Sequence, residues 1–225
     1  MGPADEENAT ASGYDEWATS YDDSDPSTWL DEPFLLEHLK PYTNCRVLDM
    51  GCGTGRYLRG LPPSAYRVTG VDLSKNMLSR ARQTLGNRRD ISLVQASVTC
   101  LPFHPKSFDR IMSGLVIDHV VSVEQFFLQL SHVLVVGGRA VVAAVHPDIQ
   151  RITGSDIKVQ GEGKNLVQIH GHIHEVQHLL AAAQGAGLTV AAMDEPAITS
   201  AMLEYRPDWN KKLGCRALLL LALMK

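Results

Sequence analysis

Residues 47–57 read VLDMGCGTGRY, and this stretch decides the fold of the chain. The run from Cys45 to Met50 is short and mostly apolar, which predicts a buried strand. Glycines follow at positions 51, 53 and 55. Because glycine has no Cβ atom, the chain can turn sharply there and a ligand can approach the backbone. Arg56 can start a helix, whose first N–H groups have no partners within the helix and can bind an anion. The stretch therefore predicts the strand–turn–helix of a nucleotide-type cofactor site.

Two later stretches support this interpretation. The strand-like run Tyr66–Val71 ends at Asp72, about twenty residues after the glycine turn, the usual spacing for a carboxylate that binds ribose hydroxyls. A third element at residues 94–98, followed by LPFHPKSFD at 101–109, comes at the right distance for the wall of an adenine site. Strands alternate with helices through short connections, so we expect a parallel sheet with cofactor and substrate at the carboxyl ends of its strands.

The rest of the chain continues this alternation. The further strands are expected at residues 92–95, 108–115 and 139–145, from 188 onward, and at 216–224. Helices are expected at residues 33–40, 74–85 and 123–134, and again from about 174 to 185. The polar stretch 147–165 is expected to form a long loop over the substrate. Residues 1–13 are expected to be disordered, or helical only on binding.

The chain carries three motifs that are typical of one protein family: LDMGCGTG from Leu48, TGVDLSKNML from Thr69 and LPFHPKSFD from Leu101. With them, residues 14–145 resemble the Rossmann-like, class I S-adenosylmethionine-dependent methyltransferases, in particular the small-molecule and quinone-biosynthesis-like group. The resemblance implies an α/β fold with a mostly parallel seven-stranded sheet, an antiparallel C-terminal edge strand and helices on both faces. It also implies S-adenosylmethionine as cofactor, a methyltransferase domain at 33–225, and an N-terminal segment at 1–32 whose helix caps cofactor and substrate.

The resemblance assigns the cofactor site residue by residue. The residues that it places there are Tyr14, Tyr21, Asp49, Gly51, Gly53, Gly55, Asp72, Leu73, Met77, Ser97, Val98 and Gly114. Asp72 would accept hydrogen bonds from both ribose hydroxyls, and Leu73 and Met77 would pack on the adenine. One position departs from the family, which usually has an acidic residue where this chain has Ser97, to accept a hydrogen bond from the adenine amine. We therefore expect weaker cofactor binding, but not its loss.

Three histidines are candidates for a catalytic base. Transfer of a methyl group from a sulfonium is an in-line displacement, which depends on alignment more than on acid–base catalysis. A base is needed only if the acceptor arrives protonated. His119 follows the expected fourth strand and His146 the fifth, while similar sequences suggest that His174 lines the substrate pocket. Each of the three can instead have a role in packing or positioning.

A metal site is the sharpest alternative for the histidines near the C-terminus. His170, His172 and His174 alternate, so on a strand they would share a face, and His178 adds a fourth imidazole. Imidazole is a common zinc ligand, but only Glu175 accompanies this group and no cysteine does. We therefore expect no metal.

Composition restricts the partners and the compartment. The 225 residues carry a net charge of −4 without a basic excess, which disfavours a nucleic-acid substrate. The apolar run 217–223 is far too short to span a bilayer, and the polar, acidic N-terminus does not have the pattern of a secretory signal. The four cysteines are scattered, which suits free thiols in a reducing compartment, so we expect a cytoplasmic protein. The oligomeric state stays open.

The function expected from these observations is methyl transfer to a small, apolar or aromatic acceptor. An aromatic rim of Tyr14, Trp17, Tyr21 and Trp29 would favour such a molecule. One alternative is an S-adenosylmethionine-binding protein that does not transfer methyl groups and acts as a cyclase-like catalyst or a partner subunit. The absence of an acidic residue at position 97 slightly favours this alternative. A nicotinamide-dependent oxidoreductase is disfavoured, because the glycines alternate and no Tyr-x-x-x-Lys pair is present.

Overall fold

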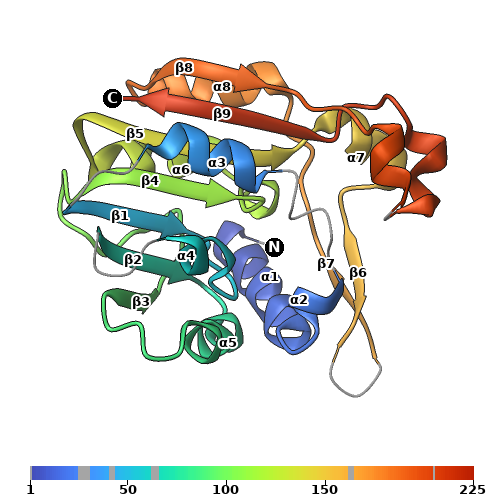
Figure 1. Ribbon diagram of the computed structural model, residues 1–225, viewed down its shortest axis with the longest axis horizontal. Helices are drawn as coiled ribbons and strands as arrows, with labels where there is room; N and C mark the ends of the chain where they lie inside the picture. The colour runs from blue at the N-terminus through green and yellow to red at the C-terminus, as the bar shows by residue number, and fades with distance from the viewer. Residues whose placement is uncertain (1, 25–30, 41–43, 62–65, 162–164, 205) are drawn as a thin grey trace.

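The computed structural model describes residues 2–24, 31–40, 44–61, 66–161, 165–204 and 206–225 (Figure 1). Its centre is a seven-stranded sheet with the strand order β3-β2-β1-β4-β5-β9-β8. The strands of this sheet are β1 (Cys45–Met50), β2 (Tyr66–Asp72), β3 (Ile91–Gln95), β4 (Phe108–Gly114), β5 (Leu134–Val145), β8 (Thr189–Asp194) and β9 (Leu218–Met224). The first five strands pair in parallel, as the alternation of strands and helices predicts.

The antiparallel C-terminal strand is also confirmed. Strand β9 pairs antiparallel with both β5 and β8, so it lies between these two strands. Strand β8 is the outermost strand at this end of the sheet. Its residues Leu218–Leu223 are all buried, whichever face they point to. A strand that is covered on both faces has a continuous apolar sequence rather than an alternating one. This burial explains why the last apolar run in the chain ends in the sheet.

Helices cover both faces of the sheet, as Figure 1 shows. Helices α3 (Glu32–Leu39), α4 (Arg56–Gly60) and α5 (Lys75–Leu85) bury their apolar side chains in one cluster with β1 and β2. Helices α6 (Val123–Val133) and α8 (Val176–Gly185) pack on the other face, where Phe126 and Phe127 are fully buried. Ser74 caps α5 by accepting a hydrogen bond from the Met77 N–H at 3.1 Å, which fixes where this helix begins after β2. Within the described residues, no helix is both long and apolar enough to cross a membrane.

The prediction of a long loop at 147–165 is wrong for its described residues. They form helix α7 (Pro147–Thr153) and strand β6 (Ile157–Gln160), which pairs antiparallel with β7 (Leu166–Ile169). The helix begins after His146, whose ring nitrogen accepts a hydrogen bond from the Asp148 N–H at 3.1 Å, and proline suits the first helical position. The apolar and polar residues of β6 alternate, as expected for a strand, but the run is only four residues long and has polar neighbours, so it does not stand out in the sequence.

The prediction of a disordered start is wrong for residues 3–13. They belong to helix α1 (Pro3–Trp17), which is followed by the short helix α2 (Tyr21–Ser24). Figure 1 shows α1 lying beside the carboxyl ends of β1 and β2. It packs against β7 so closely that a Cβ atom on Gly13 would be 2.6 Å from the Ile169 side chain. Tertiary contacts, and not local apolar periodicity, therefore hold this helix in place.

Candidate active site

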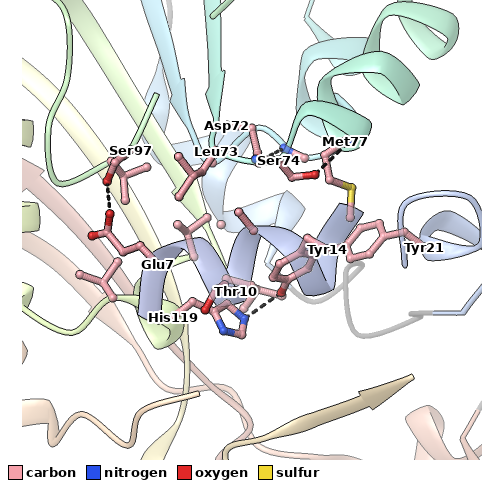
Figure 2. Close-up of a pocket in the computed structure, with 18 residues that line it drawn as sticks. Glu7, Thr10, Tyr14, Tyr21, Asp72, Leu73, Ser74, Met77, Ser97 and His119 are labelled. Carbon is pink, nitrogen blue, oxygen red and sulfur yellow. Dashed lines mark hydrogen bonds between the residues drawn. The ribbon is translucent and has the colours of Figure 1, made fainter. Parts of the chain in front are cut away.

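A first cavity of about 110 Å³ lies between α1 and the loops that follow β1, β2, β3 and β4 (Figure 2). Of the residues that the resemblance assigns to the cofactor, the structure brings all but Asp49 and Gly55 into its wall. They are Tyr14, Tyr21, Gly51, Gly53, Asp72, Leu73, Met77, Ser97, Val98 and Gly114. The carboxyl ends of parallel strands are where ligands bind in open α/β sheets, and this cavity occupies that position.

The glycines of the wall serve different purposes. Gly53 has a φ of +53°, and a Cβ atom built on it would meet no other atom within 4 Å, so the backbone faces open space there. Gly51 has a φ of +79°, and its Cβ would collide with the side chain of Val116. A Cβ on Gly114 would collide with the Tyr57 ring. Gly51 and Gly114 are therefore needed for packing, whereas Gly53 leaves room for a ligand beside the backbone.

Asp72 ties the glycine turn to the beginning of α5. Its carboxylate accepts hydrogen bonds from the Gly53 N–H and the Ser74 N–H, each at 2.8 Å. Burial raises the pKa of Asp72 to about 6, while these two backbone donors oppose the shift. A carboxylate offers about four lone-pair sites, so Asp72 can still accept hydrogen bonds from the hydroxyls of a ligand.

Asp49 is fully buried and lies behind the wall rather than in it. Neither of its carboxylate oxygens has a hydrogen-bond partner among the described residues. Burial raises the pKa of Asp49 to about 8; Arg56 opposes this shift, and Asp72 adds to it. An unpaired buried carboxylate costs free energy, and a nearby positive charge reduces that cost. The turn thus suits a ligand that carries an ammonium group.

Three carboxylates hold α1 and α2 on the strand-end loops. Each accepts hydrogen bonds from hydroxyls or N–H groups that follow a different strand, at distances of 2.6–2.9 Å. The pairs are Glu7 with Ser97 and Thr99, Asp15 with Ser74 and Asn76, and Asp22 with Thr54. Sequence reasoning missed these acids, because no motif surrounds them and their only signal is a recurrence of acidic residues in a polar segment.

His119 and Tyr14 form a hydrogen-bonded pair at the edge of this cavity. The Nδ1 atom of His119 lies 2.9 Å from the carbonyl oxygen of His170, which can only accept, so Nδ1 carries the proton. The Nε2 atom therefore accepts a hydrogen bond from the Tyr14 hydroxyl at 2.7 Å. Burial lowers the pKa of His119, which keeps its imidazole neutral near pH 7. This pair can accept a proton from a bound molecule.

A second, larger cavity of about 720 Å³ adjoins the first. Both cavities are lined by Tyr14, Tyr21, Leu115 and His119. Much of the remaining wall comes from α7, the loop after it and β6, so the segment 147–160 does enclose a space here. Trp17, Val145 and Arg206 also line it. Its lining combines apolar and aromatic side chains with polar and charged ones, among them Ile157, Lys158, Val159, Asp118 and Gln150. The expected rim residue Trp29 lies outside the described residues.

The other two candidate bases lie away from both cavities. His146 is buried, with Nδ1 at the start of α7 and Nε2 2.9 Å from the Glu195 carboxylate. His174 is also buried, with Nε2 2.9 Å from the Val120 carbonyl oxygen. Both imidazoles are thus occupied by structural hydrogen bonds. In the part of the chain that the structure describes, no three His, Cys, Asp or Glu residues gather in an arrangement that could hold a metal ion.

Comparisons with known proteins agree with this geometry. A family model described as "Methyltransferase domain" matches residues 48–142. A malonyl-[acyl-carrier protein] O-methyltransferase from Erwinia pyrifoliae is 34% identical over 111 residues, which cover 49% of this chain and 41% of that protein. A demethylmenaquinone methyltransferase from Clavibacter sepedonicus is 30% identical over 133 residues, or 57% of this chain and 54% of that protein. A tRNA U34 carboxymethyltransferase from Vibrio cholerae is 34% identical over 112 residues, which cover 48% of this chain and 34% of that protein.

The matched part spans about half or less of these curated relatives. Among solved structures, an S-adenosylmethionine-dependent methyltransferase from Mesorhizobium loti matches 86% of this chain and 96% of its own, with a TM-score of 0.69 and 25% identity. The match to this structure extends over the seven-stranded sheet as well as residues 48–142, which the family model covers. Residues 48–142 carry a methyltransferase domain, and the chain has the fold of the class I S-adenosylmethionine-dependent methyltransferases.

Proposed function

We propose that this protein transfers the methyl group of S-adenosylmethionine to a small acceptor that binds in the second cavity. One observation carries this proposal: the two cavities share the wall formed by Tyr14, Tyr21, Leu115 and His119. In-line displacement requires donor and acceptor to be held in contact and in alignment. Two adjoining cavities with a common wall satisfy this requirement without moving either ligand.

The residues of the first cavity fit the cofactor. When bound, S-adenosylmethionine supplies a methyl group activated by a sulfonium. Asp72 would hold the ribose hydroxyls, Gly53 would leave room for the backbone contact, and Leu73 would pack on the base. Met77, which the resemblance also assigns to the base, lies beside Tyr14 and Tyr21 at the other end of the cavity (Figure 2). The buried, unpaired Asp49 would favour the positive charge of the ligand.

Deprotonation of the acceptor would fall to the pair of His119 and Tyr14. The backbone carbonyl of His170 fixes the tautomer of His119, so that Nε2 is the basic atom. An acceptor hydroxyl in the second cavity can pass its proton to Tyr14 while the Tyr14 proton moves to Nε2, or can replace Tyr14 at that nitrogen. His146 and His174, whose ring nitrogens serve the fold, are not part of this proposal.

The acceptor that we propose is a small, mostly apolar molecule with a ring. Trp17, Tyr21, Ile157 and Val159 give the second cavity apolar and aromatic surface, which favours such a ligand. The net charge of −4 argues against a polyanion such as RNA, although one relative is a tRNA-modifying enzyme. No disulfide joins any of the four cysteines, which all lie in the described residues, and a reducing cytoplasm stays our expectation.

The test is a transfer assay with S-adenosylmethionine that carries a labelled methyl group. Phenols and quinols, short carboxylic acids, and tRNA are offered in parallel, and formation of S-adenosylhomocysteine and labelled product is measured. We expect label only in ring-containing small molecules. Label in tRNA would overturn the proposed acceptor class. Binding of S-adenosylhomocysteine without transfer to any acceptor would favour the alternative, a cofactor-binding protein that does not transfer methyl groups.

A further inference from the structure

Helix α1 brings a carboxylate to the loop after β3. The side chain of Glu7 accepts a hydrogen bond from the Ser97 hydroxyl at 2.8 Å and another from the Thr99 hydroxyl at 2.6 Å. Glu7 and Ser97 are both part of the wall of the first cavity. They are ninety residues apart in the sequence, so this contact is a product of the fold.

The part of the cofactor that lies beside Glu7 and Ser97 follows from the orientation that methyl transfer requires. The inference therefore rests on the proposed function. The methyl group has to face the wall shared with the second cavity, next to Tyr14 and His119. The ribose belongs at Asp72, after β2. The base must then lie on the opposite side of the ribose, toward the loop after β3. Figure 2 shows Glu7 and Ser97 together at one end of the cavity, with Tyr14 and Tyr21 at the other.

The loop after β3 has no acidic side chain of its own in the cavity wall, where it contributes Ser97 and Val98. A carboxylate has about four lone-pair sites, and the hydroxyls of Ser97 and Thr99 occupy two of those on Glu7. Two sites remain for N–H donors. The exocyclic amine of adenine is such a donor, whereas hypoxanthine has an oxygen acceptor at the same position.

We infer that Glu7 recognises the exocyclic amine of the adenine and makes the site specific for an adenine-containing cofactor. The carboxylate comes from the N-terminal helix, and Ser97 and Thr99 orient it. This arrangement offsets the loss of charge at position 97 that the sequence indicates. Docking of α1 and recognition of the base are then one event, because the same carboxylate does both.

The experiment measures binding by calorimetry, with no turnover required. The full chain and its Glu7→Gln variant are titrated with S-adenosylhomocysteine and with the analogue in which hypoxanthine replaces adenine. We expect the unaltered protein to bind the adenine compound more tightly. Glu7→Gln should weaken binding of that compound by about 10- to 100-fold, the range for a hydrogen bond to a charged group, and leave the analogue's affinity the same or higher. Adding Ser97→Asp to this variant should restore the preference.

Asp15→Asn is the matched control, because Asp15 holds α1 to Ser74 and Asn76 but does not line the cavity. It should change the affinities of both ligands by the same factor, so that their ratio stays constant. If Glu7→Gln also leaves the ratio constant, Glu7 only anchors the helix and the inference is wrong. If the unaltered protein does not bind S-adenosylhomocysteine at all, the proposed function itself fails.

Discussion

The two cavities of this protein are assembled in different ways. The cofactor cavity is built mainly from loops that directly follow β1, β2, β3 and β4, and it is narrow, at about 110 Å³. The second cavity takes its wall from α1, η2 (Ile117–His119), α7 and β6, and it holds about 720 Å³. Residues for binding the cofactor thus recur at regular intervals in the chain, whereas residues for the acceptor come from separate segments. The predictions below test whether the two cavities also separate in function.

The largest effect should come from Gly53→Val. The new side chain would point into the open space of the first cavity, so cofactor binding should become undetectable by calorimetry. Gly86→Val is a close control: Gly86 has a φ of +57° and equally open space around its Cβ position, but it lies outside both cavities. Both variants place valine at a positive φ, so the control reports what such a backbone position does by itself. Equal affinity in both would mean that the glycine turn does not approach the cofactor.

His119→Ala should lower turnover by about 10²-fold or more, if the acceptor carries a proton that must be removed. The affinity for S-adenosylhomocysteine should stay nearly constant, because His119 contacts the acceptor side through Nε2 and the Tyr14 hydroxyl. Tyr14→Phe keeps the aromatic ring and removes only the hydroxyl. We expect a smaller loss of turnover than in His119→Ala, and its size would measure how much proton transfer through the Tyr14 hydroxyl contributes. A large loss of cofactor affinity in His119→Ala would assign the residue to packing.

Asp72→Ala should weaken cofactor binding by about 1.5–3 kcal/mol, the range for hydrogen bonds to a charged group. Part of this loss comes from the turn, since Asp72 also accepts the Gly53 N–H. Asp90→Ala is the control, because Asp90 pairs with Arg88 before β3 and lines neither cavity. Titration of both folded variants with S-adenosylhomocysteine decides the matter: unchanged affinity in Asp72→Ala would remove this residue from the site.

The same contrast explains what the sequence could predict. Gly53 and Asp72 follow consecutive parallel strands, and the geometry of such a sheet brings their loops together whatever the rest of the chain does. Glu7 could not be predicted, because its place at Ser97 depends on how α1 docks across ninety residues of sequence. Asp118 was missed for a related reason: its buried carboxylate accepts a hydrogen bond from the Val145 N–H at 2.9 Å, a contact between η2 and the end of β5.

The last prediction concerns Asp49 and the dependence of stability on pH. Burial raises the pKa of Asp49 from its ordinary 3.8 to about 8, so the folded state favours the protonated carboxyl. Its stabilising contribution is complete below about pH 4 and is lost as the pH rises through about 8. In that window the free energy of unfolding should fall by up to about 1.4 kcal/mol per pH unit on account of this group alone.

Asp72 and Asp118, with pKa values of about 6 and 7, add to the same trend, so the contribution of Asp49 has to be measured as a difference. Asp49→Asn removes one titrating group and keeps the shape of the side chain. Urea unfolding between pH 5 and pH 8 should therefore give a shallower decline for the variant than for the unaltered protein. Saturating S-adenosylhomocysteine should reduce the difference, because its ammonium favours the ionised form of Asp49. Parallel declines with and without the ligand would show that Asp49 belongs to the core of the fold and not to the cofactor cavity.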